Sequence, residues 1–231
     1  MKTLGMIGGV GPESTIDYYK NIIAMYRERR PDGSYPQFII NSINLQEGID
    51  FMEAGNLAGM AEFLLKEIEK LPPAGAEFGI VAANTPHIVF DEVALKSPIP
   101  LISIVEATCD YAKERQLKRL ALFGTRYTMR ADFYQKVFER DAISLILPEP
   151  KDQDYVHEKY FAELVPGKFL PETRAGLFSI VDRMSAKFGI DGVILAGTEI
   201  PLILREASYN GVTLLDTGKI HCQAAVNEMF K

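Results

Sequence analysis

The chain has 231 residues, of which 47% are hydrophobic and 24% are charged, a composition typical of globular proteins. A formal net charge of −6, without a long Lys/Arg stripe, argues against nucleic acid as a partner. No apolar stretch approaches membrane-spanning length and the first residues do not resemble a signal peptide, so we expect a cytoplasmic protein without membrane contact.

Short aliphatic runs alternate with longer amphipathic stretches, which is typical of parallel strands joined by crossover helices. In chain order, we expect strands at residues 3–7, 37–42, 78–82, 101–103, 119–123, 144–147, 192–195 and 213–215. We expect helices at residues 14–28, 57–71, 86–96, 105–115, 131–140, 152–164, 171–188 and 218–229.

Two pairs of segments repeat within the chain. KTLGMIG at 2–8 matches KRLALFG at 118–124 with an offset of 116, and FGIVAANT at 78–85 matches GVILAGTE at 192–199 with an offset of 114. Any two buried strands that end in small residues look alike, but two pairs at nearly equal offset favour a duplication. We therefore predict an α/β fold of two pseudo-symmetric Rossmann-like halves with parallel sheets, 1–104 plus 209–231 and 105–208, with a ligand-binding cleft between them.

The first expected strand runs into a glycine-rich turn, GGVGPEST at 8–15. The turn lacks both the G-x-G-x-x-G spacing and the lysine of a P-loop, so it does not support nucleotide binding. Free backbone N–H groups at a helix start attract anions, so Gly9 and Ser14 are candidates to bind a carboxylate. Capping of the following helix by Ser14 or Thr15 is the alternative.

Further polar residues follow other expected strands. Asn84 and Thr85 come after the strand at 78–82, and Thr198 follows the matching strand of the second half. Thr125 and Thr128 lie in GTRYTM at 124–129, the counterpart of the glycine turn. Hydroxyl and amide groups are suitable donors to a carboxylate, although helix capping competes as the explanation for each threonine.

Taken together, GG-x-x-x-EST, A-NT-PH, GTRYTM and GTEI resemble, in order and spacing, the aspartate/glutamate racemase superfamily. The resemblance covers nearly the whole chain. It implies pyridoxal-independent chemistry without a cofactor, a small carboxylate or amino acid as ligand, and a homodimer.

Members of that family carry two catalytic cysteines, and the matching positions here are Ala83 and Gly197. Neither residue can transfer a proton, so two-base racemisation is expected to be impaired. The only cysteines, Cys109 and Cys222, fall in expected helices and are interpreted as small buried hydrophobes.

Two ionisable residues lie near these positions, and we name His87 and Glu199 as candidates for proton transfer. A histidine on a helix surface and a capping or salt-bridged glutamate are the competing interpretations. The scattered histidines and cysteines form no metal-ligand spacing, so no metal is expected. Aspartate-selective relatives have basic residues where this chain has Gly48 and Val165, so an acidic substrate cannot be assumed.

The sequence thus leaves three functions open. The first is a racemase-like isomerase that is impaired in two-base racemisation. The second is an enzyme that performs a one-base reaction, such as isomerisation, decarboxylation or elimination. The third is a protein that binds a small carboxylate without transforming it.

Overall fold

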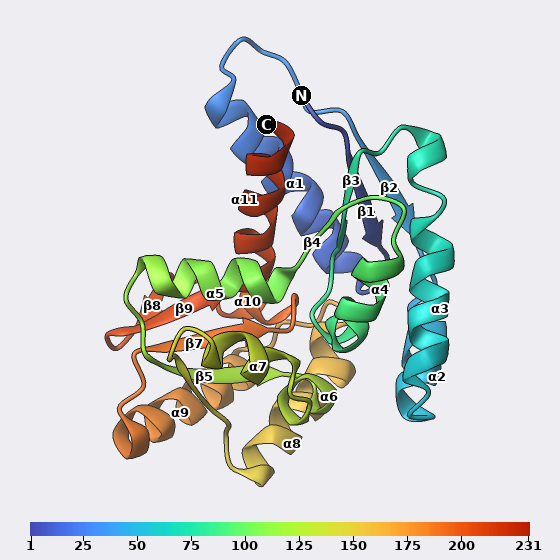
Figure 1. The fold of residues 1–231 in the computed structure, drawn as a ribbon. Coiled ribbons are helices and arrows are strands. Elements are labelled where there is room, and N and C mark those ends of the chain that lie inside the picture. Colours follow the sequence, from blue (N-terminus) through green and yellow to red (C-terminus); the bar gives the residue numbers. More distant parts are fainter. The chain divides into compact units, whose positions relative to one another are not determined.

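The computed structural model describes residues 1–231 and contains two separate sheets flanked by helices (Figure 1). The strands of the first sheet are β1 Leu4–Gly8, β2 Phe38–Ser42, β3 Phe78–Val81 and β4 Leu101–Ile102. Those of the second sheet are β5 Arg119–Gly124, β6 Ser144–Ile146, β7 Gly192–Ala196, β8 Ser208–Tyr209 and β9 Val212–Asp216. All neighbouring strands are parallel except β8 and β9, which confirms the predicted α/β class with parallel sheets.

The chain divides into two compact units. Unit 1 comprises Met1–Ala107 and Gly218–Lys231, and unit 2 comprises Thr108–Thr217. The helices of unit 1 are α1 Pro12–Arg29, α2 Leu45–Glu53, α3 Leu57–Ile68 and α4 Phe90–Lys96, with short turns η1 Pro72–Ala74 and η2 Thr85–Val89. Those of unit 2 are α6 Arg126–Arg130, α7 Phe133–Glu139, α8 Pro150–Lys159, the π-helical turn η3 Tyr160–Leu164, α9 Pro171–Phe188 and α10 Ile200–Ile203. Two helices, α5 Ile104–Glu114 and α11 Thr217–Met229, include the points where the chain passes between the units.

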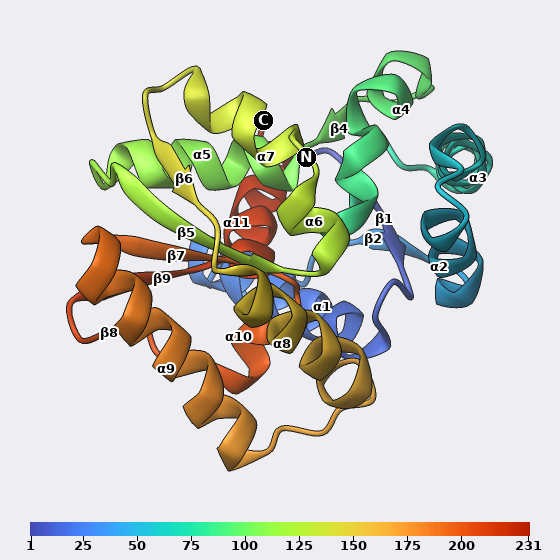
Figure 2. The same ribbon diagram turned by 90° about the horizontal axis from the view of Figure 1, so that it is seen from below.

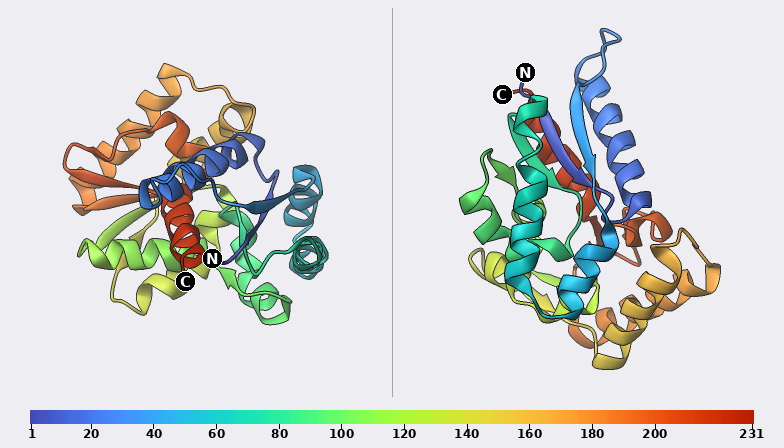
Figure 3. Two further views of the ribbon diagram at one scale, coloured as in Figure 1. Left: turned by 90° about the horizontal axis from the view of Figure 1, so that it is seen from above. Right: turned by 90° about the vertical axis from the view of Figure 1, so that its right-hand side faces the viewer.

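The sheet of unit 1 has the strand order β2-β1-β3-β4 and is covered on both faces. Helices α1 and α11 lie on one face and α3 on the other (Figures 1 and 3). The first face packs Leu4, Met6, Phe78 and Ile80 against Tyr18, Ile22, Cys222 and Val226. The second packs Ile7 and Val81 against Met60, Leu64 and Ile68. Burial on both faces explains why β1 and β3 are continuous apolar runs rather than alternating patterns.

The sheet of unit 2 has the order β6-β5-β7-β9-β8. Figure 2 shows α8 and α9 on one side of this sheet and α7 on the other. The core on the α8 and α9 side contains Phe123, Val193 and Leu195 from the strands, packed against Val156, Leu177 and Val181.

One strand lies in a different half from the one that the sequence predicted. We assigned residues 209–231 to the first half, but β9 pairs with β7 along Gly192↔Thr213 to Leu195↔Asp216 and therefore belongs to unit 2. Only the segment from Gly218 onward joins unit 1, where α11 packs on the first sheet. A β-strand is stabilised by the neighbour that satisfies its backbone groups, and sequence repeats alone did not identify that neighbour.

The two sheets share a connectivity. If only the parallel strands of each unit are numbered, from its own first strand, both sheets have the order 2-1-3-4, and the antiparallel strand β8 lies at the edge of the second sheet. This agreement extends the two sequence repeats to the level of topology. No helix in the chain is both long enough and apolar enough to cross a membrane.

Candidate functional site

In unit 1, strand pairing brings two of the predicted turns side by side. Strands β1 and β3 are paired from Leu4↔Phe78 to Ile7↔Val81, and the Ala82 N–H donates to the Ile7 carbonyl at 2.9 Å. The glycine turn after β1 and the Ala83-Asn84-Thr85 segment after β3 therefore leave the sheet at the same edge. In open parallel sheets, ligands bind at this edge.

The glycine turn satisfies its own polar groups. The Gly9 N–H donates to Thr15 Oγ1 at 2.8 Å, and the hydroxyls of Ser14 and Thr15 donate to the Gly11 carbonyl at 2.9 and 3.0 Å. Ser14 is buried. Helix α1 begins after Gly11 without a side-chain cap, so Ser14 and Thr15 bond within the turn rather than capping the helix. Ligand binding by Gly9 and Ser14 stays a prediction.

His87 holds the strand end that contains Ala83. Its Nδ1 donates to the Ala83 carbonyl at 2.8 Å, and its Nε2 accepts from the Ile104 N–H at 3.2 Å. With one nitrogen donating and the other accepting, the ring is neutral. Burial, together with nearby His221, lowers the pKa of His87 to about 3. Both ring nitrogens of His87 thus bond to the backbone of this turn, which argues against a role in proton transfer. That role stays a prediction.

The other polar residues at this edge are also enclosed. Asn84 is only 2% exposed, and Thr85 is partly buried at the start of η2. Pro86 occupies the first turn of η2, as the sequence suggested. This edge thus presents a compact turn, in which Ala83, where the family resemblance implies a cysteine, is also buried.

In unit 2, the ends of β5 and β7 are adjacent because Gly124 pairs with Ala196. Thr125 caps α6: its side chain accepts from the Thr128 N–H at 3.2 Å, and the two hydroxyl oxygens are also 3.2 Å apart. Both threonines are buried. Capping therefore accounts for their position, and contact with a ligand stays a prediction.

Gly197 lies against the side chain of Tyr160. A Cβ at position 197 would be 2.6 Å from Tyr160 Cε2, closer than carbon atoms can approach without movement. The Tyr160 hydroxyl and the Thr198 hydroxyl both donate to Glu199 Oε2, the latter at 3.2 Å. Glu199 is fully buried, and burial together with Glu199 raises the pKa of Tyr160 well above its usual value. The end of β7 is thus a buried phenol, carboxyl and hydroxyl cluster.

His157 lies at the exit of β5, and the sequence analysis did not select it. Its Nδ1 accepts from the Arg126 N–H at 3.2 Å, and its ring is edge-on to Tyr127 and Phe161. Burial and the Arg126 guanidinium lower the pKa of His157, which is partly exposed. A signal was present: His157 and Tyr160 are three residues apart in an expected helix and so share a face.

Neither cysteine is near a strand end. Cys109 is buried in α5, where burial and a contact with Asp141 raise the pKa of its thiol to about 12. Cys222 is fully buried in α11. Nowhere in the chain do three His, Cys, Asp or Glu side chains gather as a set of metal ligands.

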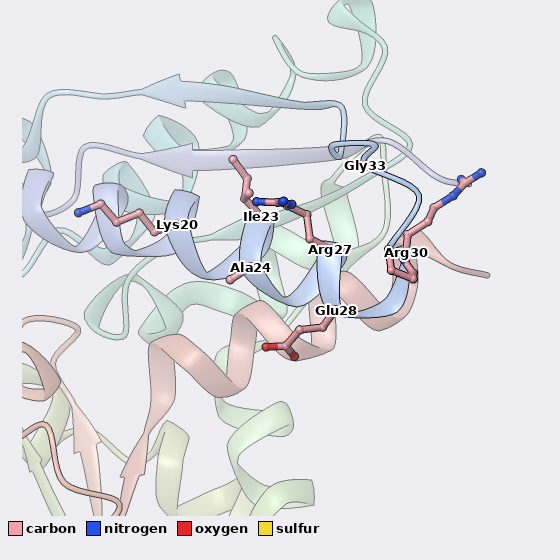
Figure 4. Close-up of a pocket in the computed structure, with 8 residues that line it drawn as sticks. Lys20, Ile23, Ala24, Arg27, Glu28, Arg30 and Gly33 are labelled. Carbon is pink, nitrogen blue, oxygen red and sulfur yellow. The ribbon is translucent and has the colours of Figure 1, made fainter.

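A surface pocket of about 490 Å³ lies elsewhere, along the second half of α1. Three cationic side chains line it, those of Lys20, Arg27 and Arg30. Figure 4 shows that they point in different directions. Arg27 lies over the ring of Tyr35 and Arg30 bonds to Asp32, so these cations do not converge on an anion.

Comparison with known proteins relates this geometry to a family. The model of the Asp/Glu/Hydantoin racemase family matches residues 7–225. A broad specificity amino-acid racemase from Bacillus subtilis is 24% identical over 169 residues, which cover 70% of this chain and 67% of that protein.

Two solved structures match the whole chain. A Yersinia pestis protein proposed to be an Asp/Glu racemase is 31% identical with a TM-score of 0.89, and all of both chains is covered. An aspartate racemase homologue from Pyrococcus horikoshii OT3 is 34% identical with a TM-score of 0.83, again over all of both chains.

Proposed function

The chain belongs to the Asp/Glu/hydantoin racemase family, and we propose that it binds a small carboxylate at its strand-end turns without catalysing two-base racemisation. Racemisation of an amino acid requires removal of the Cα proton on one face and delivery of a proton on the other. At the two positions where the family resemblance implies thiols, this chain has Ala83 and Gly197. The expectation from the sequence that both halves contact one ligand is part of this proposal.

The observation that carries the proposal is the packing at Gly197. The ring of Tyr160 occupies the space into which a side chain at position 197 would extend. A missing thiol is therefore accompanied by a local repacking rather than by an empty space that another acid or base could enter.

The remaining ionisable groups also support it. The thiol of Cys109 has a pKa of about 12, and Cys222 is enclosed in a helix. His87 uses both ring nitrogens for backbone contacts. Since a positioned acid or base contributes roughly 10² to 10⁴ to a rate, loss of both thiols should remove most racemase activity.

A one-base reaction is the second candidate, because a transferable proton does lie beside Gly197. At this strand end the Thr198 hydroxyl donates to Glu199, and the Tyr160 hydroxyl and Glu199 form a hydrogen-bonded pair. Such a pair could protonate a carbanion that forms by loss of a leaving group. The pair would not readily accept a Cα proton, because the raised pKa of Tyr160 keeps its phenol protonated near pH 7.

The first prediction is that the protein exchanges no appreciable Cα proton of aspartate or glutamate with solvent. Proton NMR in D₂O with each enantiomer measures the exchange directly, and a thermal-shift assay with the same compounds measures binding. Binding without exchange is the expected result. Rapid racemisation would contradict the proposal, whereas exchange with retention of configuration would favour the one-base reaction.

The family resemblance also implies a homodimer, and the lack of a membrane-spanning helix leaves the cellular compartment to be determined. We include the homodimer and the cytoplasmic location in the proposal. Light scattering during size-exclusion chromatography and cell fractionation test them.

A further inference from the structure

We propose that His157 is a ligand-binding residue of unit 2, which donates a hydrogen bond from Nε2 to the bound carboxylate and takes up a proton when the ligand binds. The inference rests on the proposed function, because it concerns how the same strand ends would hold a carboxylate. It is carried by the position, tautomer and surroundings of this one ring.

His157 lies on a helix that passes the ends of two neighbouring strands. Helix α8 and its continuation η3 pass the carboxyl ends of two neighbouring strands, and Figure 2 shows α8 beside α6. His157 bonds to Arg126, two residues after β5 ends, while Tyr160 lies against Gly197, the residue after β7 ends. Because Gly124 and Ala196 are paired and adjacent strands are about 4.8 Å apart, both side chains belong to one small region.

The second step is the tautomer. The Arg126 N–H donates to Nδ1, so the neutral ring carries its hydrogen on Nε2. Nε2 makes no hydrogen bond to another group of the chain, and the side chain is partly exposed. His157 therefore has a donor of fixed direction and a site that can exchange protons with solvent.

The other side-chain donors around β5 and β7 already have partners within the chain. Arg126 donates twice to Asp154, at 3.1 and 2.9 Å, and Arg130 contacts Asp154 and Gln153. The Tyr160 hydroxyl donates a hydrogen bond to Glu199. The charged donors of this region already bond to side chains of α8 or its neighbours. His157 Nε2 is therefore the titratable donor that can bond to a ligand.

The electrostatic surroundings determine the sign of the proton linkage. The charged groups that act on the ring are Arg126 and Arg130 from α6, which lower its pKa, and Asp154 and Glu158 from α8, which raise it. Phe161 and Tyr127 add apolar surface. With burial, the net effect is a pKa below the usual value, so the free protein has a neutral His157 near pH 7. A bound carboxylate stabilises the imidazolium and raises that pKa.

The experiment is calorimetric titration with malonate near neutral pH in two buffers of different ionisation enthalpy. We expect proton uptake on binding, and an affinity that rises by up to about tenfold per pH unit as the pH falls from the pKa of the complex to that of the free protein. NMR of the histidine rings identifies the group: burial lowers the pKa values of His87 and His221 to about 3 and 4, so a ring that gains a proton near neutral pH when malonate binds is that of His157.

Two variants complete the test. His157→Gln keeps a possible acceptor for Arg126 but cannot take up a proton, so we expect proton uptake to vanish and affinity for malonate to fall roughly tenfold or more. Lys151→Gln alters an exposed residue of the same helix that is not among the charged groups acting on the ring, and it should retain both proton uptake and binding.

Two results would overturn the inference, and they have different meanings. Malonate binding with no proton uptake and an unshifted His157 resonance would remove His157 from the site but leave the proposed carboxylate binding intact. If neither malonate nor aspartate bound to the wild-type protein, the proposed function would fail and this inference with it.

Discussion

At the scale of single residues, the two positions where the family resemblance implies thiols are not equivalent. Ala83 retains a Cβ and lies in a turn that His87 holds through the Ala83 carbonyl. Gly197 has no Cβ, and Tyr160 fills the space beside it. A thiol at position 83 would extend an existing side chain, whereas a thiol at position 197 would need space that Tyr160 occupies.

Introducing a thiol at position 197 should therefore lower the stability of the folded protein. We predict that Gly197→Cys destabilises the protein by about 1–3 kcal/mol, the usual cost of overpacking a core, because Tyr160 must move away from Glu199. Denaturant unfolding measures this free energy. Ala83→Cys, which adds one atom to an existing Cβ, is the comparison and should cost less.

A double-mutant cycle isolates the contact. In a Tyr160→Leu background, Gly197→Cys should cost less than in the wild type, because the ring edge that blocks position 197 is gone. An equal cost in both backgrounds would show that the penalty arises elsewhere, for example from the backbone of the turn. The cycle also shows which background is suitable for testing whether thiols at positions 83 and 197 restore proton exchange.

At the scale of elements, the sequence predicted what depends on apolar patterning. Buried strands such as β1 and β5 and long helices such as α9 lie within about two residues of their expected positions. Short elements such as α10 were missed, because four residues give no measurable periodicity. The expected helix at 152–164 changes to a π-helical turn at Tyr160, which apolar patterning does not predict.

The candidate site was predictable only as a set of strand ends. Pairing of β1 with β3 and of β5 with β7 places the expected turns together. The sequence could not show that Thr125 caps α6 or that Thr15 accepts a hydrogen bond from the Gly9 N–H, because both interactions depend on the local backbone conformation. His157 was missed because it follows no strand and reaches the site from a helix.

The glycine turn after β1 gives a prediction at this scale. Gly9 has a φ of +81°, and a Cβ there would lie 2.4 Å from the Ile43 carbonyl oxygen. Gly9→Ala should therefore destabilise unit 1 by more than the roughly 1 kcal/mol of left-handed backbone strain alone. Gly33→Ala is the matched control, because Gly33 has a φ of +84° but nothing within 4 Å of its Cβ position. Equal losses in the two variants, measured by denaturant unfolding, would rule out the clash.

At the scale of the whole molecule, the parallel strands of the two sheets share the order 2-1-3-4, which agrees with the repeats at offsets of 116 and 114. Their strand ends have nevertheless diverged: unit 1 uses a neutral histidine to hold its turn, and unit 2 uses a phenol and a carboxyl group. Two sheets with the same order of parallel strands thus carry chemically different edges.

The stability of the molecule should depend on pH because two histidines are buried in unit 1. His221 donates to the Ile102 carbonyl at 2.9 Å and accepts from the Tyr18 hydroxyl at 3.0 Å, and burial lowers its pKa to about 4. The pKa of His87 is lowered to about 3, also mainly by burial. Both rings are therefore neutral in the folded protein at pH values where the unfolded chain, with a histidine pKa near 6.5, binds protons.

Stability should consequently fall as the pH is lowered through about 6.5 toward 4, by up to about 1.4 kcal/mol per pH unit for each buried histidine. Ion-paired carboxylates lose their contribution only at lower pH, since their unfolded pKa values lie near 4, so the upper part of this window reports mainly on histidine. Denaturant unfolding at several pH values between about 7 and 5 measures the slope. The His157→Gln protein should keep most of that slope, because His157 is only partly buried. A stability that stays constant down to pH 5 would mean that His87 and His221 become protonated in the folded protein, and that the neutral hydrogen-bonding pattern described for both rings is wrong.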